Sequence, residues 1–414
     1  MKKKMLSLLL GLTMTATLLA GCGSAAEEGS AGTDAAKTEG TAAGAVDASA
    51  VKVGIIYIGD ENEGYTESHM KGIDEMQKAL GIEDSQVIEK TNIPEDESAY
   101  DAAVDLADQG CNIIFATSFG QESYLIQAAS EYPEIQFCHA TGYQAASSGL
   151  SNMHNYFTSI YEARYVSGVV AGLKLNAMIE DGTITADAAK IGYVGAFPYA
   201  EVVSGYTSFY LGAKSVCPTV TMDVQYTNSW GNMSAEAEVA SQLIANGCVL
   251  IGQHADTTGA PSTAETAGIP CVGYNVDMTT VAPNSALISA YNNWGPYYTY
   301  AVQSVLEGTA MSTDWCQGYN EDAVGTTAIN EAVAAEGSAD KVEEIKAAIK
   351  DGSLHVFDTS TFTVNGSSIE DLIANDTEFA KYADYVKDGY YHESELASVP
   401  SFDLRIDGIT ELTE

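Results

Sequence analysis

Short apolar runs alternate with amphipathic stretches along most of the chain, beginning at Val51. The first run, 51–58, predicts a buried strand, and a polar loop over 59–64 follows it. Apolar residues then recur at helical spacing over 68–80. The same alternation continues through strands at 87–90, 111–116 and 135–139 and helices at 100–108 and from Tyr124. This order is typical of an α/β protein with a parallel sheet.

The pattern then repeats in the second half of the body. Strands are predicted at 190–195, 220–226, 248–252 and 269–273, with helices at 202–213 and 236–245. The sequence itself shows the repeat, because Gln109-Gly110-Cys111 corresponds to Asn246-Gly247-Cys248. A body of this length exceeds one ordinary core, so we predict two similar α/β lobes. Beyond them we predict a strand at 354–357 and a hairpin turn at 363–366.

The beginning of the sequence has the pattern of an export signal. Lys2, Lys3 and Lys4 precede an apolar stretch that ends in Leu19-Ala20-Gly21-Cys22. This ending resembles the lipobox of bacterial lipoproteins, in which the cysteine carries the lipid. Residues 1–21 are therefore predicted to be a signal peptide, and Cys22 to be lipidated on the extracytoplasmic face of the cell membrane. Residues 22–50 are small and polar, which predicts a disordered spacer.

Charge and composition exclude several kinds of partner. The net charge of −39 argues against nucleic acid and against adhesion to anionic lipid. The six cysteines after Cys22 form no CxxC pair. We interpret Cys111, Cys138, Cys248 and Cys271 as buried small side chains, and disulfides stay an alternative because export permits them.

Motifs of catalysis and metal binding are missing from the sequence. We expect no enzyme activity, no cofactor and no metal site. The pair His254 and Asp256 could act as an acid and a base, but contacts with a ligand or between lobes explain it better. Arg164 lies in a predicted helix beside Glu162. A structural ion pair is the favoured role for Arg164, and contact with the ligand or the hinge is the alternative.

The loops after the predicted strands combine aromatic rings with polar groups. Open α/β sheets bind ligands beyond the carboxyl ends of their strands, and two lobes that face each other make a cleft that can close. Flat rings stack on flat ligands, while fixed polar groups read the edge of a heterocycle. The loops concerned are 59–66, 117–120, 196–201, 227–230, 252–258, 274–278 and 291–298.

Several of these runs resemble the basic membrane protein (BMP) family of lipoproteins, the nucleoside- and nucleobase-binding subunits of ABC importers. The resemblance covers roughly residues 51–360. The matching runs are Gly64-Tyr65-Thr66-Glu67-Ser68-His69, Thr117-Ser118-Phe119-Gly120, Tyr161-Glu162-Ala163-Arg164-Tyr165, Asn228-Ser229-Trp230, Gln253-His254-Ala255-Asp256-Thr257 and Asn293-Trp294-Gly295-Pro296-Tyr297-Tyr298.

The resemblance implies an α/β fold of the periplasmic-binding-protein type I class, with two doubly wound parallel-sheet lobes and a ligand cleft between them. It also implies three chain crossings between the lobes. On this basis lobe 1 comprises 51–157 plus about 290–330, and lobe 2 comprises 158–289 plus about 331–395. Residues 396–414 are then predicted to be an acidic tail.

The implied ligand is purine-like and held between aromatic rings, and the implied partners are ABC permease subunits and the membrane. We expect a monomer. Nucleoside-binding members have an Asp where this chain has Asn275, and their Lys for the ribose has no equivalent here. We therefore expect a free nucleobase, with a nucleoside, or a sensing role beside a membrane signalling protein, as alternatives. The candidate ligand-binding residues are Tyr65, Thr66, Ser118, Phe119, Gly120, Phe197, Glu201, Trp230, His254, Asp256, Thr257, Asn275, Asp277, Asn293 and Trp294.

Overall fold

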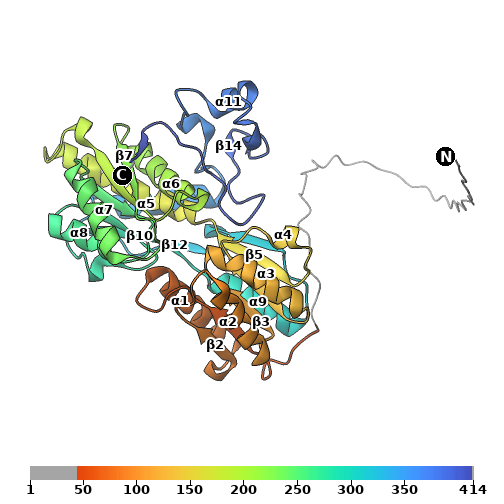
Figure 1. The fold of residues 1–414 in the computed structure, drawn as a ribbon. Helices are drawn as coiled ribbons and strands as arrows, with labels where there is room; N and C mark the ends of the chain where they lie inside the picture. The colour runs from red at the N-terminus through yellow and green to blue at the C-terminus, as the bar shows by residue number, and fades with distance from the viewer. Residues whose placement is uncertain (1–43, 413–414) are drawn as a thin grey trace, which may run out of the picture. The chain divides into compact units, whose positions relative to one another are not determined.

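The computed structural model describes residues 44–412. The predicted signal peptide, Cys22 and most of the predicted spacer lie outside this range. Two sheets organise the described residues (Figure 1). The sheet of lobe 1 is built from β1 (Val53–Ile56), β2 (Val87–Lys90), β3 (Ile113–Ala116), β4 (Gln136–Ala140), β5 (Met153–Thr158) and β11 (Asp314–Gln317). Its order is β11-β5-β4-β3-β1-β2, and every pair is parallel.

The first helix of lobe 1 begins and ends where the sequence supplies caps. The first helix starts after Glu63, whose carboxylate accepts hydrogen bonds from the N–H groups of Tyr65 and Thr66, and it ends at Gly81 with φ of 67°. Helix α9 packs against α1, although more than two hundred residues separate them. The helices are α1 (Gly64–Leu80), α2 (Glu97–Asp108), α3 (Glu122–Glu131), α4 (Ala145–Ser148) and α9 (Gly295–Glu307).

Lobe 2 repeats the arrangement with one additional strand, at one edge of its sheet. Its strands are β6 (Lys190–Gly195), β7 (Thr221–Tyr226), β8 (Leu250–Gln253), β9 (Cys271–Tyr274), β10 (Ala286–Asn292), β12 (Val324–Thr326) and β15 (Ile409–Glu411). The order is β12-β10-β9-β8-β6-β7-β15, and only β12 runs antiparallel to its neighbour. Its helices are α5 (Ile160–Glu180), α6 (Ala200–Val216), α7 (Met233–Ala245), α8 (Gly259–Ala267) and α10 (Ser338–Lys350).

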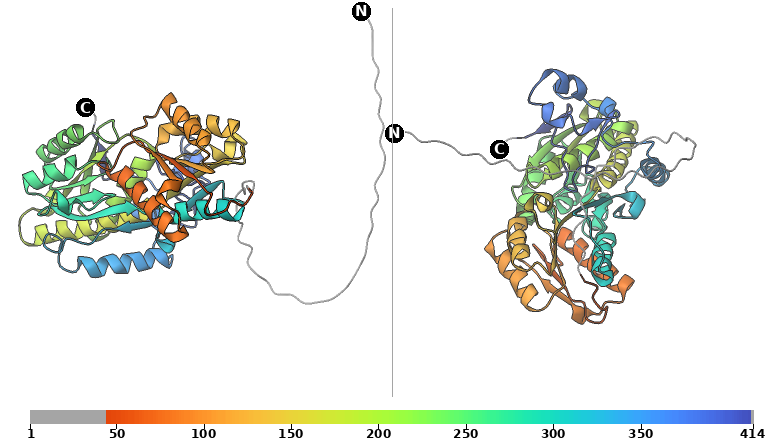
Figure 2. Two further views of the ribbon diagram at one scale, coloured as in Figure 1. Left: turned by 90° about the horizontal axis from the view of Figure 1, so that it is seen from below. Right: turned by 90° about the vertical axis from the view of Figure 1, so that its right-hand side faces the viewer.

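Glycines allow α5 and α6 to pack with their backbones in contact. A Cβ atom on Gly168 would lie 2.0 Å from the carbonyl oxygen of Phe209, and one on Gly212 would lie 2.1 Å from that of Tyr165. Helix α10 lies along α5, as the left view of Figure 2 shows. Helix α5 is therefore buried along most of its length, which explains why its sequence is apolar on every side.

The chain crosses between the lobes three times, as expected. The crossings follow Thr158, Asn292 and Gln317, the last residues of β5, β10 and β11. The expected fold class is confirmed. The second segment of lobe 1 is shorter than predicted, because β12 returns to the sheet of lobe 2 before residue 330.

The C-terminal part corrects two predictions. Residues 354–357 form no strand; they lead into a turn in which Val356 and Phe357 are buried. The segment predicted as an acidic tail contains β15, which pairs in parallel with β7, because Phe402, Leu404 and Ile406 anchor the preceding residues in the core. The remaining elements are α11 (Ile369–Asn375), β13 (Val386–Lys387) and β14 (Tyr390–Tyr391).

The predicted hairpin turn is confirmed, since Asn365 and Gly366 have φ of 52° and 78° between bridging Val364 and Ser367. The spacer prediction is wrong for residues 44–50. They form a turn, and the N–H of Val46 donates to the carbonyl of Val305 at 3.3 Å. All four cysteines interpreted as buried are buried and free. Within residues 44–412, no helix is long and apolar enough to cross a membrane.

Candidate functional site

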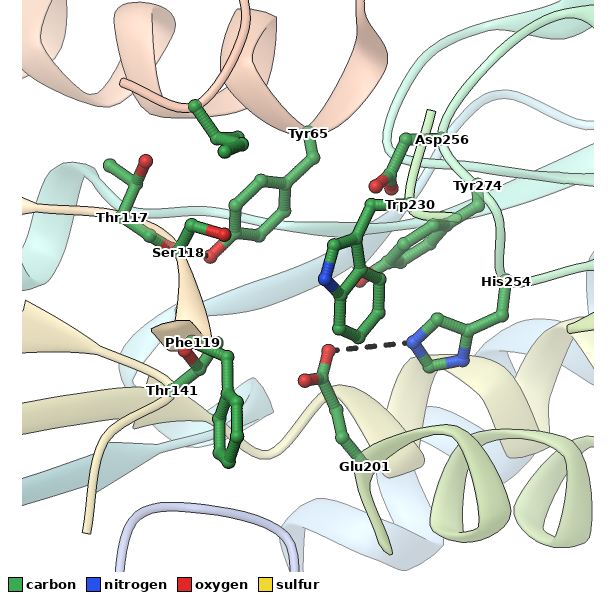
Figure 3. A pocket seen from close by; sticks show the side chains of 11 residues that line it. Tyr65, Thr117, Ser118, Phe119, Thr141, Glu201, Trp230, His254, Asp256 and Tyr274 are labelled. Atoms are coloured by element: carbon green, nitrogen blue, oxygen red, sulfur yellow. Dashed lines mark hydrogen bonds and ion pairs between the residues drawn. The ribbon is translucent and has the colours of Figure 1, made fainter. Parts of the chain in front are cut away.

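A cavity lies between the two lobes, at the carboxyl ends of their strands. Figure 3 shows its side chains converging from both sides. The backbone of the lobes also meets here, because the N–H of Gly64 donates to the carbonyl of Asp256 at 3.1 Å. The lining residues are Ile58, Tyr65, Thr117, Ser118, Phe119 and Thr141 from lobe 1 and Glu201, Trp230, His254, Asp256 and Tyr274 from lobe 2.

Tyr65 occupies the first turn of α1, where the Glu63 cap fixes the backbone. Its hydroxyl donates to the carbonyl oxygen of Thr117 at 2.7 Å, at the end of β3. The ring meets His69 edge-on, with the centroids 4.5 Å apart. The ring is therefore held at its base and at its tip, and one flank faces the cavity.

A buried aromatic cluster supports Tyr65 from behind. His69 stacks on Trp294 with centroids 4.2 Å apart and an angle of 9° between the rings. Its Nδ1 lies 2.6 Å from the hydroxyl of Tyr298. Burial lowers the pKa of His69 well below its usual value, so the ring is neutral. Trp294 is fully buried and donates to the hydroxyl of Ser68 at 3.0 Å.

Aromatic rings from both lobes meet beside the cavity. Phe119 of lobe 1 lies 5.6 Å from Tyr199 of lobe 2, measured between ring centroids. Phe197 stacks on Tyr199 at 5.1 Å and meets Trp230 edge-on at 5.2 Å. Phe197 thus supports Trp230, which lines the cavity, without lining it itself.

The carboxyl and imidazole groups of the cavity all come from lobe 2. Burial raises the pKa of Glu201 to about 7, and nearby Arg164 partly opposes this. Burial, with the carboxylates of Glu63, Glu236 and Glu201, raises the pKa of Asp256 well above its usual value. The Nε2 atom of His254 lies 3.4 Å from Glu201, and burial followed by Arg164 holds the pKa of His254 well below normal. These groups form a site that can accept hydrogen bonds from ligand N–H groups.

Arg164 lies behind this wall. Its Cζ atom is 3.9 Å from the centroid of the Tyr274 ring, and its NH1 group donates to the hydroxyl of Tyr193 at 2.6 Å. Among the described residues Arg164 does not form the favoured structural ion pair, and the neighbouring Glu162 accepts from the N–H of Tyr319 at 2.8 Å. Arg164 therefore supports a cavity residue rather than pairing with a carboxylate in its own helix.

Seven of the candidate residues line the cavity: Tyr65, Ser118, Phe119, Glu201, Trp230, His254 and Asp256. The others have different surroundings. The hydroxyl of Thr66 donates to Glu63, the N–H of Gly120 to Glu95, and the N–H of Thr257 to Glu236. Asp277 caps a short turn at Thr279. Asn293 donates to the carbonyl of Asp322, and Asn275 accepts from Asn292.

Four lining residues were not among the candidates: Ile58, Thr117, Thr141 and Tyr274. Thr117 directly follows β3 and Ile58 lies two residues beyond β1, so the rule on strand ends could have found them. Tyr274 is the last residue of β9, and a strand buried on both faces does not reveal which way its side chains point. Thr141 has φ of 66°, which no sequence pattern indicates.

Comparison with known proteins identifies the family. A family model described as Bmp, ABC transporter substrate-binding protein PnrA-like, matches residues 50–356. The chain belongs to the Bmp family. Its members bind substrates for ABC transporters, so this Bmp protein is a substrate-binding protein and not an enzyme.

Relatives of this Bmp protein carry different ligand names. The chain is 36% identical over 311 residues to a purine-binding protein of Brucella abortus, covering 74% of this chain and 83% of that protein. It is also 36% identical over 198 residues to an ABC transporter protein of Haloferax volcanii named for glucose binding, covering 48% of this chain and 47% of that protein.

Solved structures agree with the fold. A solute-binding protein of an ABC transporter from Conexibacter woesei has a TM-score of 0.59 at 20% identity and covers 74% of this chain and 98% of its own. One from Aeropyrum pernix has a TM-score of 0.60 at 16% identity and covers 80% of this chain and 98% of its own. Both support the two-lobed periplasmic-binding-protein fold of the Bmp protein.

Proposed function

We propose that this Bmp protein captures a purine nucleobase, or a similar heterocycle, outside the cytoplasm and delivers it to an ABC permease. The observation that carries the proposal is the composition of the cavity. Rings of Tyr65, Phe119, Trp230 and Tyr274 surround it, and carboxyl groups of Glu201 and Asp256 enter it. A flat heterocycle with N–H groups satisfies both features, because it stacks on rings and donates to the carboxyl oxygens.

A free base fits this lining better than a nucleoside. A ribose diol is best held by charge-assisted hydrogen bonds. Among the described residues, no lysine or arginine lines the cavity. Asn275, which stands where nucleoside-binding members have Asp, lies behind the lining and accepts hydrogen bonds from Asn292. The relative named for purine binding, which matches along most of its length, supports the purine class.

Calorimetry on the purified full-length protein tests the proposal. Adenine, guanine and hypoxanthine should bind more tightly than adenosine and guanosine, and mass spectrometry of ligand released from fresh protein should detect a base. Trp230→Ala should weaken binding by more than about 1 kcal/mol if the indole stacks on the ligand. Leu396→Ala is the control, because Leu396 is 48% exposed and lies outside the cavity lining. Tighter binding of nucleosides would overturn the preference for bases.

A sugar is the second candidate, because one relative is named for glucose binding. Aromatic rings also suit a sugar, because its C–H faces stack on them. D-Glucose therefore belongs in the same titration. Saturable glucose binding without purine binding would replace the proposed ligand.

Attachment to the membrane belongs to the same proposal. The run Leu19-Ala20-Gly21-Cys22 supports lipidation of Cys22 after export. Cys22→Ser should release the protein from the membrane fraction and leave its affinity for the ligand unchanged. Membrane retention of that variant would show that another element anchors the protein.

A further inference from the structure

Tyr274 is a cavity residue whose ring and hydroxyl are both fixed. The guanidinium of Arg164 lies over its ring at 3.9 Å, and only 2% of the residue is exposed. Its hydroxyl accepts a hydrogen bond from the side-chain Nδ2 of Asn292 at 3.0 Å. Figure 3 shows the ring reaching from the end of β9 into the group of lining side chains, behind Trp230. Its hydroxyl therefore faces the space that a ligand would occupy.

The direction of this hydrogen bond follows from a backbone group. The main-chain N–H of Asn292 contacts the side-chain oxygen of Asn275 at 3.4 Å, and an N–H can only donate. The contacted atom of Asn275 is therefore the oxygen. The side-chain atom of Asn292 that lies 3.0 Å from the same oxygen must then be the NH₂ group. The other side-chain atom of Asn292 is its oxygen, which accepts from the hydroxyl of Thr158 at 2.5 Å.

This orientation decides what the Tyr274 hydroxyl offers the cavity. The Asn292 NH₂ group is a donor, so the hydroxyl oxygen must accept from it, and its hydrogen is left to donate elsewhere. Among the described residues, the hydrogen bond from Asn292 is the one contact of this hydroxyl within hydrogen-bonding geometry. A buried donor without an acceptor is costly, and a ligand that brings an acceptor removes that cost.

We propose that Tyr274 determines specificity by donating a hydrogen bond to a carbonyl oxygen or ring nitrogen of the bound heterocycle. Asn292 and Asn275 are positioning residues, because they fix the direction of the donation. The inference rests on the proposed function. Together with Glu201 and Asp256, it defines a ligand that presents an acceptor at Tyr274 and N–H donors toward the carboxyl groups.

The backbone of Asn275 supports its positioning role. Its φ of 59° is in the left-handed region, which asparagine tolerates better than most residues. Its N–H donates to the carbonyl of Ala290 at 2.8 Å, which ties the residue to β10. The side-chain oxygen is thereby held against Asn292, at the point where the chain crosses between lobes.

The first experiment separates a directed hydrogen bond from general packing. Tyr274→Phe keeps the ring and removes the hydroxyl. Calorimetry compares it with wild type on the tightest-binding base among adenine, guanine and hypoxanthine, and on analogues that each lack one ring nitrogen or the exocyclic oxygen. The variant should lose about 3- to 10-fold in affinity for the parent base. One analogue, which lacks the acceptor, should bind both proteins equally. An unchanged affinity for the parent base, or the same loss for every analogue, overturns the proposal.

The second experiment tests the positioning residues through selectivity. Asn275→Asp keeps an oxygen toward Asn292 and should preserve the wild-type ratio of affinities between the parent base and the selected analogue. Asn275→Leu and Asn292→Leu should reduce that ratio toward one, because the hydroxyl then turns freely. Thermal unfolding of each variant shows whether it is folded. Loss of the ratio in Asn275→Asp, or its retention in a folded Leu variant, contradicts the proposal. A wild-type protein that binds no base contradicts the proposed function instead.

Discussion

The two lobes share a frame but bring different chemistry to the cavity. In lobe 1, Gly54 of β1 packs against Leu106 and Cys111; in lobe 2, Gly192 of β6 packs against Leu243 and Cys248 in the same way. The glycines that end the adjoining helices, Gly110 and Gly247, have φ of 84° and 88°. The repeated frame therefore fixes where the strands end, and the loops beyond them decide the chemistry.

The two lobes line the cavity with different functional groups. Lobe 1 offers an aliphatic side chain, two rings and four hydroxyl groups, while lobe 2 offers two carboxyl groups, an imidazole, two rings and one hydroxyl group. Polar groups of lobe 1 are hydrogen-bonded within the lobe: Tyr65 donates to Thr117, and Ser118 donates to Glu95 at 2.6 Å. The difference indicates that lobe 1 supplies a rigid platform and lobe 2 reads the polar edge of the ligand.

The largest expected effect tests the platform of lobe 1. Trp294→Ala removes a fully buried ring that stacks on His69, and should lower the free energy of unfolding by about 3–5 kcal/mol. Urea unfolding measures this loss. Tyr143→Ala, an exposed ring of the same lobe, should change it by less than about 0.5 kcal/mol. Equal effects in both variants would contradict a rigid platform.

The second prediction tests whether the frames are equivalent. A Cβ atom on Gly54 would lie 3.0 Å from Leu106, and one on Gly192 would lie 2.9 Å from Leu243. Gly54→Ala and Gly192→Ala should each cost about 1–3 kcal/mol of unfolding free energy through overpacking. Chemical unfolding of both variants should give costs that agree within error. A large cost in one lobe alone would show that only one frame is tightly packed.

The third prediction concerns the carboxyl groups of lobe 2. The pKa of Glu201 is raised to about 7 from 4.5, so the folded protein holds a proton that the unfolded chain releases between these values. Its contribution to stability is therefore complete below pH 4.5 and is lost as pH rises toward 7. Relative to wild type, Glu201→Gln should gain on the order of 1–2 kcal/mol between pH 5 and pH 7.5.

Urea unfolding of ligand-free protein at the two pH values measures this difference. Glu236, with a pKa also raised to about 7, contributes equally to both proteins and cancels in the comparison. The matched control is Glu238→Gln, an exposed residue of α7, which should follow wild type at both pH values. A Glu201→Gln difference that does not change with pH would mean that Glu201 is already ionised in the fold.

Sequence patterns predicted the strands and helices of the frame well, because each element depends mainly on residues close together in the sequence. Gly110 and Gly247 end their helices as the repeated letters indicated. Sequence patterns did not predict side-chain directions that depend on residues distant in the sequence. Trp294 follows a strand like the cavity rings do, but it points inward because α9 approaches α1 closely at Gly72, where a Cβ atom would lie 2.7 Å from Trp294.

The C-terminal residues show the same limit. Residues 396–414 are acidic, and their composition gives no sign that Ile409–Glu411 joins the edge of a sheet nearly two hundred residues earlier. Glu411 accepts hydrogen bonds from Tyr206 and Tyr226 of lobe 2. Such pairing depends on a partner strand that already exists, so it follows from the tertiary structure and not from local periodicity.

The smallest expected effect separates the two lobes most directly, since it compares one hydroxyl from each. The Tyr65 hydroxyl donates to a main-chain carbonyl of its own lobe, so it has no hydrogen left for a ligand. Tyr65→Phe keeps the ring and should cost about 1 kcal/mol of stability, while affinity for a purine base changes less than about 3-fold. Tyr274→Phe in lobe 2 should lose more affinity and less stability than Tyr65→Phe. The Tyr274 hydroxyl only accepts within the protein, so its hydrogen is free for the ligand. Calorimetry and urea unfolding on both variants check this. If Tyr65→Phe loses as much affinity as Tyr274→Phe, then lobe 1 also reads the ligand's polar edge, and the division between platform and reader does not hold.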